Sequence, residues 1–434
     1  MRIHLLTLGC PKNEVDSEMM AVLLARAGHQ TVAERERADL ILVNTCGFIE
    51  PARQETYALL DELIATRRRR QALVVTGCLA QRSSADLCAR YPVDAVVGTR
   101  AWPEIVEVVA QIERRQGRPV ILVPDEGNLV ASVPRQAMGR YSAYLKIGDG
   151  CDAACAYCTI PSIKGRQQSK PAADVVREAR ELAAQGVVEA VLIAQDTTAY
   201  GRDLGADVSL AALLRRLDAE VQGLAWQRIL YAYPQHVTAE LIEAMATLPS
   251  VCHYLDIPLQ HGHPDVLRRM RRPYDVQQVY DLVAALRTAM PDIALRSTFI
   301  VGFPGETEPE FAGLLDLLAQ VRFDKVGVFQ FSAEKGTPAF DMPDQVPPEL
   351  KQERFDRAMT LQQGISAEIN QGLIGRRLSV LVEEASAGVS VGRSYRDAPE
   401  IDGVVTIPTE LTPGTFVEVQ VTGADEYDLT AQLV

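Results

Sequence analysis

The first part of the chain alternates short apolar stretches with helical segments. The apolar stretches predict strands at residues 2–8, 38–44, 72–76 and 94–97, and the segments between them predict helices near residues 14–27, 51–70, 79–90 and 102–116. Neighbouring parallel strands need a crossover connection, which a helix usually provides. The alternation therefore predicts a doubly wound parallel sheet with helices on both faces. In such a sheet, ligands collect beyond the carboxyl ends of the strands.

A second alternating series starts near residue 141. The stretch before it, residues 119–140, contains prolines and glycines with little periodicity and predicts a linker, whose first residues, 119–123, suit an edge strand. The series predicts strands at 143–147, 190–193, 227–231, 253–257, 295–301 and 325–329, with helices between them, for example at 172–185, 209–220, 239–247, 276–290 and 308–321. About six βα units indicate a barrel or an open partial barrel with its site at the carboxyl ends of the strands.

The pattern changes again after a long polar helix predicted at residues 348–374. Five short strands are predicted at 378–383, 388–392, 404–407, 415–421 and 427–433, separated by turn residues, which is typical of a small antiparallel β-barrel. We therefore expect an α/β protein with an N-terminal domain (1–123), a linker (124–140), a partial βα barrel (141–371) and a small recognition barrel (372–434).

Charge limits the partners of this last barrel. The whole chain of 434 residues has a formal charge of −13, and residues 373–434 contain four Arg, no Lys and ten Asp or Glu. An RNA-binding barrel needs Lys and Arg to meet phosphates. RNA contact through this domain is therefore not expected, whereas a basic protein partner suits it.

The cysteine content and the absence of long apolar stretches predict a cytoplasmic protein. The apolar residues 1–8 run into a Gly-Cys-Pro turn without a small-residue cleavage site, which favours a first strand over a signal peptide. No stretch approaches the roughly twenty apolar residues of a membrane span. Eight cysteines without an export signal then suggest metal ligands or core thiols in a reducing compartment.

Three of these cysteines, Cys151, Cys155 and Cys158, follow the first strand of the second series with the spacing C-x3-C-x2-C. Three thiolates can hold three irons of a four-iron, four-sulfur cluster and leave the fourth iron open to a small molecule. A zinc site usually has four ligands, and neither a second cysteine pair nor a close histidine follows. A disulfide is disfavoured because three cysteines in a short loop pair badly.

Cys10, Cys46 and Cys78 each lie about two residues beyond a predicted N-terminal strand, in a turn that contains a glycine. Equivalent positions at one sheet edge would bring the three thiols together, although their spacing alone does not require it. Unrelated buried cysteines remain the alternative, because free cysteine is commonly buried. No other cysteine is expected near Cys88 or Cys252, and both are interpreted as core thiols.

Other polar residues also follow predicted strands of the second series. Gln195 follows the second strand, Gln260 the fourth, and Gly302 opens a Gly-Phe-Pro-Gly turn after the fifth. Arg296 lies inside the fifth strand, where a charged side chain needs a partner that a ligand carboxylate could provide. Three histidines, at 236, 261 and 263, show no spacing typical of metal ligands, and structural hydrogen bonding is the first interpretation for them.

The C-x3-C-x2-C spacing with Tyr157 before the last cysteine resembles the radical S-adenosylmethionine (SAM) enzymes. Together with the N-terminal cysteines and the final barrel, it makes the whole chain resemble the methylthiotransferases. Three local sequence motifs resemble those of the ribosomal-protein branch, the RimO family. They are Leu-Gly-Cys-Pro-Lys-Asn at 8–13, Ile-Ala-Gln-Asp-Thr-Thr-Ala-Tyr-Gly at 193–201, and Gly-Arg-Ser at 392–394 followed by Asp-Ala-Pro-Glu-Ile-Asp-Gly at 397–403. The tRNA-modifying branch usually has Gln-Met-Asn after its first cysteine.

This resemblance implies the addition of a methylthio group to the β-carbon of an aspartate in small-subunit ribosomal protein twelve. It implies two 4Fe–4S clusters, one on each cysteine trio, as well as SAM, a TRAM-like last domain and an electron donor of the flavodoxin or ferredoxin type. By resemblance, Tyr157, Gln195, Gln260, Arg296 and Gly302 contact SAM or face it. The usual Gly-Gly-Glu of the superfamily is replaced here by Ala-Gln-Asp at residues 194–196. The resemblance therefore does not identify the residue that binds the amino group of the methionine part of SAM.

Two alternatives stay open at the level of sequence. The first is an adenosine methylthiotransferase that acts on tRNA, against which the acidic last domain argues. The second is a protein that carries iron–sulfur clusters for electron transfer or as structural staples and has no catalytic activity.

Overall fold

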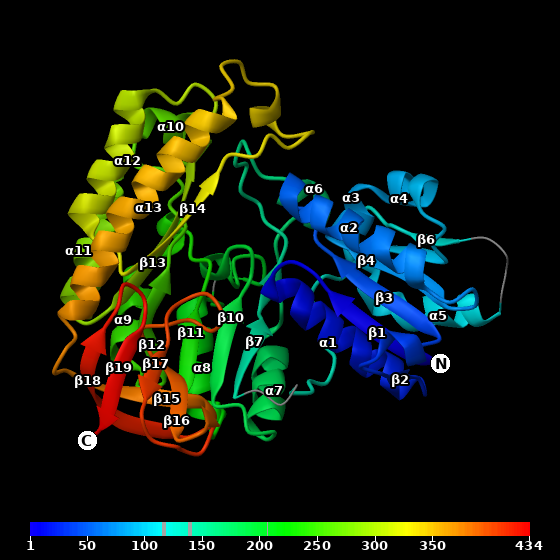
Figure 1. The fold of residues 1–434 in the computed structure, drawn as a ribbon, viewed down its shortest axis with the longest axis horizontal. Helices are drawn as coiled ribbons and strands as arrows, with labels where there is room; N and C mark the ends of the chain where they lie inside the picture. Colours follow the sequence, from blue (N-terminus) through cyan, green and yellow to red (C-terminus); the bar gives the residue numbers. More distant parts are fainter. Residues whose placement is uncertain (115–118, 138–140, 206) are drawn as a thin grey trace.

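The computed structural model of the chain describes residues 1–114, 119–137, 141–205 and 207–434. In Figure 1, the N-terminal α/β domain lies beside a larger βα domain, and the C-terminal barrel lies against one end of the larger domain. Two predicted boundaries, a helix end at residue 116 and the linker end at residue 140, lie outside the described residues. Within the described ranges, no helix combines the length and apolar character needed to cross a membrane.

The N-terminal sheet has six parallel strands in the order β2-β1-β3-β4-β5-β6, which confirms the predicted parallel sheet. Alternate residues of β3 pack on opposite faces, so that Leu42 joins the core with α1 and α5 while Val43 joins the core with α2 and α3. The strands are β1 (Arg2–Thr7), β2 (Gln30–Thr31), β3 (Leu40–Thr45), β4 (Ala72–Gly77), β5 (Ala95–Gly98) and β6 (Val120–Leu122). The helices are α1 (Pro11–Arg26), η1 (Arg35–Arg37), α2 (Glu50–Thr66), α3 (Cys78–Arg82), α4 (Ser84–Arg90), η2 (Thr99–Glu104) and α5 (Ile105–Glu113).

Two segments that we predicted as single helices are divided in the structure. The first, residues 79–90, splits into α3 and α4 because Ser83 adopts φ −139° and ψ 38°, outside the helical region. The second begins as the 3₁₀ helix η2, which contains Pro103, and continues as α5. Proline lacks the N–H that an α-helix interior needs, so the regular helix starts after it.

The βα domain contains a six-stranded parallel sheet in the order β14-β13-β12-β11-β10-β7, which confirms the predicted partial barrel. The edge strands β7 and β14 are not hydrogen-bonded to each other, so the barrel is open. The strands are β7 (Ser142–Lys146), β10 (Glu189–Ile193), β11 (Trp226–Ile229), β12 (Val251–Asp256), β13 (Ala294–Val301) and β14 (Lys325–Gln330). The helices are α7 (Ala172–Ala183), η3 (Thr197–Ala199), α8 (Leu210–Glu220), η4 (Pro234–His236), α9 (Ala239–Thr247), α10 (Pro264–Arg269), α11 (Val276–Ala289), α12 (Glu308–Val321) and η5 (Pro338–Phe340).

The long helix α13 (Pro348–Gln371) leads into a closed five-stranded barrel in the order β15-β16-β17-β19-β18. Its strands are β15 (Arg377–Ser386), β16 (Val389–Ser394), β17 (Val405–Ile407), β18 (Phe416–Ala424) and β19 (Leu429–Leu433). All pairs are antiparallel except β17 with β19, which is parallel. The predicted small barrel is thus confirmed, and β17 with β19 adds one parallel pair to it.

The end of β16 and the segment that follows it fill the amino end of the partial βα barrel. Arg393 donates to Glu189, the first residue of β10, at 2.6 Å, and Asp397 pairs with Lys325, the first residue of β14, at 2.9 Å. Asp402 accepts a hydrogen bond from the Tyr254 hydroxyl at 2.7 Å. The C-terminal barrel therefore closes one end of the βα domain and leaves the carboxyl ends of its strands to face the N-terminal domain.

Candidate functional site: two cysteine triads around one cavity

The loop that carries Cys151, Cys155 and Cys158 lies between a short strand and a short helix. It follows β8 (Gly148–Asp149), which pairs with β9 (Gln168–Ser169), and it ends at α6 (Ile160–Lys164). Gly150 has φ +76°, a region that favours glycine, and a Cβ there would collide with the Arg166 carbonyl. The loop is thus fixed at its start by a position that tolerates no side chain.

Hydrogen bonds reach all three sulfur atoms of this first triad. The backbone N–H of Ala153 donates to Cys151 Sγ and that of Ile160 to Cys158 Sγ, both at 3.4 Å. The Arg272 guanidinium donates to Cys155 Sγ at 3.6 Å. Donors aimed at sulfur are a recurrent way of tuning iron–sulfur clusters.

Burial disfavours the thiolates of Cys151 and Cys158. Together with the neighbouring thiols, burial raises the pKa of Cys151 to about 11 and that of Cys158 to about 12. A bound iron would supply the positive charge that allows these buried groups to ionise. Three converging sulfurs with donors directed at each of them fit an iron–sulfur cluster.

Cys10, Cys46 and Cys78 follow β1, β3 and β4, three adjacent strands whose register pairs Thr7 with Asn44 and Asn44 with Thr76. The three loops touch one another. A Cβ on Gly9 would lie 2.7 Å from the Cβ of Cys46, and a Cβ on Gly47 would lie 2.7 Å from the Cα of Leu79. The sheet edge therefore brings together three cysteines that are 36 and 32 residues apart in the sequence.

Burial also disfavours the thiolates of two cysteines of the second triad, Cys46 and Cys78. Burial raises the pKa of Cys78 to about 12, an effect that the nearby Lys164 ammonium opposes. Burial raises the pKa of Cys46 as well, while a hydrogen bond from the Phe48 backbone lowers it. The donor set and its burial match those of the first triad, so these residues also fit a cluster.

Both triads line one cavity of about 340 Å³ between the N-terminal and βα domains. Three of the predicted SAM contacts, Tyr157, Gln195 and Gln260, line it too. The Oε1 atom of Gln195 is buried, and no described residue donates a hydrogen bond to it. Gln260 has φ +75° and is held by hydrogen bonds with β13 on both sides, Gln260 N to Thr298 O and Ile300 N to Gln260 O, each at 2.8 Å.

The structure places the other two predicted contacts elsewhere. Among the described residues that line the cavity, neither Arg296 nor Gly302 is present. Arg296 pairs with Asp256 at 2.9 Å and with Asp402 at 3.5 Å, so protein carboxylates provide the partner that we had expected from a ligand. The N–H of Gly302 donates to the Glu306 carboxylate at 2.9 Å.

The cavity lining also contains residues to which sequence reasoning assigned no function. Those with polar or aromatic side chains include Lys12, Asn13, Phe48, Lys164, Tyr231, Tyr233 and Arg272. Lys12 stands in the quoted motif beside Cys10, but Arg272 belongs to a run of arginines after α10 that resembles any solvated helix end. Nothing in their local sequence distinguishes Tyr231 and Tyr233 from core aromatics.

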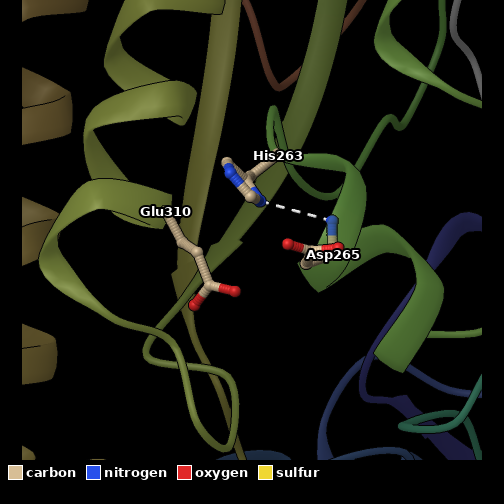
Figure 2. Close-up of side chains that lie close together, drawn as sticks. All are labelled: His263, Asp265 and Glu310. Atoms are coloured by element: carbon tan, nitrogen blue, oxygen red, sulfur yellow. Dashed lines mark hydrogen bonds between the residues drawn. The ribbon is translucent and has the colours of Figure 1, made fainter.

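A separate group outside the cavity, His263, Asp265 and Glu310, has possible ligand atoms within 4.8 Å of one another (Figure 2). These residues already make hydrogen bonds and an ion pair at the ends of α10 and α12. His263 Nδ1 accepts from the Asp265 backbone N–H at 3.2 Å at the start of α10. The Glu310 carboxylate accepts from Arg269 at 2.8 and 3.0 Å, so a guanidinium already occupies the place of a cation.

Comparison with protein families identifies the class. The model of the Radical SAM superfamily matches residues 145–318, that of the uncharacterized protein family UPF0004 matches residues 2–98, and that of the TRAM domain matches residues 374–434. The radical SAM methyltransferase TsrM from Kitasatospora setae has a similar fold, with a TM-score of 0.60 at 15% identity over 90% of this chain and 80% of that one. The cobalamin-dependent radical enzyme OxsB gives 0.55 at 12% identity over 83% and 56%. Radical SAM membership implies a 4Fe–4S cluster and SAM.

Curated relatives then identify the family. Ribosomal protein uS12 methylthiotransferase RimO of Chloroflexus aurantiacus is 48% identical over 99% of both chains. The proteins of the same name from Desulforudis audaxviator and Heliobacterium modesticaldum are 47% and 45% identical, over the whole of this chain and 97% and 95% of theirs. The chain belongs to the RimO family of radical SAM methylthiotransferases. These names favour the ribosomal-protein branch over the tRNA-modifying branch.

Proposed function

We propose that the protein attaches a methylthio group to the β-carbon of an aspartate in ribosomal protein uS12. The observation that carries this proposal is the single cavity shared by two cysteine triads. One triad suffices to generate a radical, whereas the transfer of a sulfur atom needs a second site close enough to meet the same substrate carbon. The names of the relatives supply the identity of the protein substrate.

Each triad would hold one 4Fe–4S cluster, the first on Cys151, Cys155 and Cys158 and the second on Cys10, Cys46 and Cys78. When bound, the clusters would supply an electron that cleaves SAM to the 5′-deoxyadenosyl radical and, at the second triad, the sulfur to be transferred. The β-carbon of aspartate carries no acidic proton, so a general base cannot activate it and a radical is required.

The reaction replaces one C–H bond of the substrate by one C–S bond. One C–H bond of the β-carbon breaks and its hydrogen leaves as 5′-deoxyadenosine. Cys10, Cys46 and Cys78 would hold the group that supplies the sulfur for the new C–S bond and takes up the one electron released as that bond forms. The methyl group comes from the sulfonium of a second SAM, which leaves as S-adenosylhomocysteine. The electron that starts the reaction comes from a donor of the flavodoxin or ferredoxin type in the cytoplasm.

The protein's own groups bind and orient the reactants. The unpartnered Oε1 of Gln195 can accept a hydrogen bond from the ammonium group of the methionine part of SAM. Gln195 would thus bind the group for which the Ala-Gln-Asp sequence at residues 194–196 left no identified partner. Tyr157 is partly buried beside the first triad, and Gln260 lines the same cavity. The acidic residues of the C-terminal barrel suit a basic protein substrate and disfavour RNA.

Anaerobic turnover tests the proposal. The reconstituted protein, SAM, a chemical reductant and purified uS12 are mixed, and the mass of uS12 is measured together with 5′-deoxyadenosine. We expect uS12 to gain one methylthio group in place of hydrogen, on an aspartate located by peptide fragmentation. Unmodified uS12, despite full cluster content and SAM cleavage, would refute the proposed substrate. A parallel reaction with tRNA tests the other branch.

A further inference from the structure

Three cations line the shared cavity, and they differ in their partners. Lys164 pairs with Asp149 at 3.0 Å and with Asp16 at 3.5 Å, so its charge is compensated. Arg272 donates to the Pro258 carbonyl at 2.6 Å and to Cys155 Sγ, which places its charge beside the first triad.

Lys12, beside Cys10 of the second triad, has no carboxylate partner among the described residues. Its side chain is buried, with the residue 7% exposed, and its ammonium contacts the Ala194 carbonyl at 3.4 Å and the face of the Tyr231 ring, 3.6 Å from the centroid. Among the described residues, no carboxylate lies within ion-pairing distance of Lys12 Nζ. A lysine ammonium has three donors, and burying its charge is costly unless an anion compensates it.

The surroundings hold this ammonium in place across the domain interface. Lys12 belongs to α1 of the N-terminal domain, whereas Ala194 and Tyr231 follow β10 and β11 of the βα domain. Tyr231 has φ +61°, which costs free energy for a residue with a side chain. Its backbone is fixed by bonds to Asp256, at 3.0 Å, and from Thr197, at 3.0 Å. These bonds hold Tyr231 in its strained backbone conformation, in which the face of its ring contacts the Lys12 ammonium.

Two carboxylates enter this cavity in the proposed reaction, that of SAM and that of the substrate aspartate. SAM binds at the first triad, where Arg272 is the adjacent cation. Lys12 instead lies two residues from Cys10 of the second triad, the site of sulfur transfer. The location of Lys12 therefore favours the substrate carboxylate.

We propose that the Lys12 ammonium binds the side-chain carboxylate of the substrate aspartate and so selects an acidic residue for modification. This inference rests on the proposed function. The reacting β-carbon is one bond from that carboxylate carbon, so an ion pair at Lys12 fixes the carbon between the two triads. The same ion pair rejects asparagine, which has nearly the same shape but no charge.

Binding measurements test this role without turnover. The cluster-loaded protein is titrated anaerobically with a fluorescent peptide that carries the uS12 target sequence, or with the same peptide in which the aspartate is replaced by asparagine. For the unsubstituted protein we expect the aspartate peptide to bind on the order of tenfold to a hundredfold more tightly, the range for a charged hydrogen bond. In Lys12→Met this preference should disappear, and in Lys12→Arg part of it should return. Lys335→Met, at an exposed lysine, is the matched control.

Several outcomes would overturn the inference. Equal loss of affinity for both peptides in Lys12→Met would assign Lys12 a structural role. Loss of SAM binding with an unchanged preference for aspartate would assign its charge to the SAM carboxylate. If Lys12→Met failed to load its clusters, Lys12→Arg would provide the test in its place. Equal affinity of Lys12→Arg for the aspartate and asparagine peptides would still contradict the ion pair. An unsubstituted protein that binds neither peptide and leaves uS12 unmodified would refute the proposed function itself.

Discussion

Cys46 and Cys155 line the same cavity but belong to different triads. We expect Cys46→Ala to retain SAM cleavage and to lose sulfur transfer, because only the second cluster is disrupted. Cys155→Ala should lose both activities, since the radical is generated at the first triad. Each variant should hold about four irons in place of about eight after anaerobic reconstitution. Iron content, 5′-deoxyadenosine and product mass are the three measurements, and sulfur transfer by Cys46→Ala would contradict the assignment.

Gly47 tests how closely the loops of the second triad must approach. A Cβ at this position would lie 2.7 Å from the Cα and 2.8 Å from the N of Leu79, backbone atoms that cannot turn aside. Gly47→Ala should therefore displace the start of α3, which carries Cys78, and lower iron content to about that of a single cluster. Gly364→Ala is the control, because its Cβ meets no atom within 4 Å on α13 and should stabilise that helix by about 0.5–1 kcal/mol. Full iron loading of Gly47→Ala would show that the loops can separate without loss.

Sequence reasoning at the scale of residues depended on where the signal lay. The first triad is a local pattern, and the second became visible once each cysteine was placed at the end of a strand. Arg272 and Tyr231 were missed, because their position at the cavity comes from strands and loops distant in sequence. Arg296 was placed in the correct strand, but its partner, Asp402, lies in another domain.

At the scale of elements, the parallel strands and the final barrel followed from periodicity, whereas helix breaks did not. A single non-helical residue, Ser83, divides α3 from α4, and serine is common in helices as well as at their ends. The segment after β16 was quoted as a family motif without a structural role. Its charged residues enter the amino end of the partial βα barrel, a placement that no local pattern encodes.

Glu189 is the anchor of that segment. It is fully buried, and it accepts from Arg393 at 2.6 Å and from Arg228 at 2.7 Å. Glu189→Gln should destabilise the protein by about 3–5 kcal/mol, because it leaves the buried Arg228 guanidinium without its counter-charge and removes one of the two carboxylates that contact Arg393. Urea unfolding at neutral pH measures this change. Glu62→Gln, at an exposed pair with Arg35, should change the free energy of unfolding by less than about 1 kcal/mol.

The same carboxylate predicts a pH dependence. Burial opposes its ionisation, but Arg228 and Arg393 outweigh this effect and lower the pKa of Glu189 from 4.5 to about 2. Because the folded-state pKa is lowered, the stabilisation is present above pH 4.5 and is lost as pH falls toward about 2. Over this window, the free energy of unfolding should fall more steeply for the unsubstituted protein than for Glu189→Gln. Parallel slopes would show that Glu189 is not the group that titrates.

At the scale of the whole molecule, function requires that two domains hold their triads against one cavity. Four buried charges join the domains beside it: Asp16 from α1, Lys146 from β7, Asp149 from β8 and Lys164 from α6. Two positive and two negative groups compensate one another. The sequence identified both domains but could not place one against the other, because this cluster joins residues up to 148 positions apart.

Asp16→Asn tests whether this cluster sets the domain arrangement. The substitution leaves one uncompensated positive charge in a buried site, which costs about 3–5 kcal/mol, and the N-terminal domain supplies no other member of the cluster. A hydrophobic cluster that joins Val15 and Met19 of α1 to Tyr144 and Ile193 of the βα domain remains, so both domains should stay folded while their alignment loosens. We therefore expect one thermal unfolding transition at a lower temperature than for the unsubstituted protein. SAM cleavage without uS12 should be retained and methylthio transfer should fall by more than tenfold, because the second triad no longer meets the radical. Asp61→Asn, at an exposed pair with Arg90 on the same domain, is the control and should leave the unfolding temperature and methylthio transfer unchanged. If Asp16→Asn lost SAM cleavage and methylthio transfer together, the charge cluster would support the first triad itself and not the alignment of the two domains.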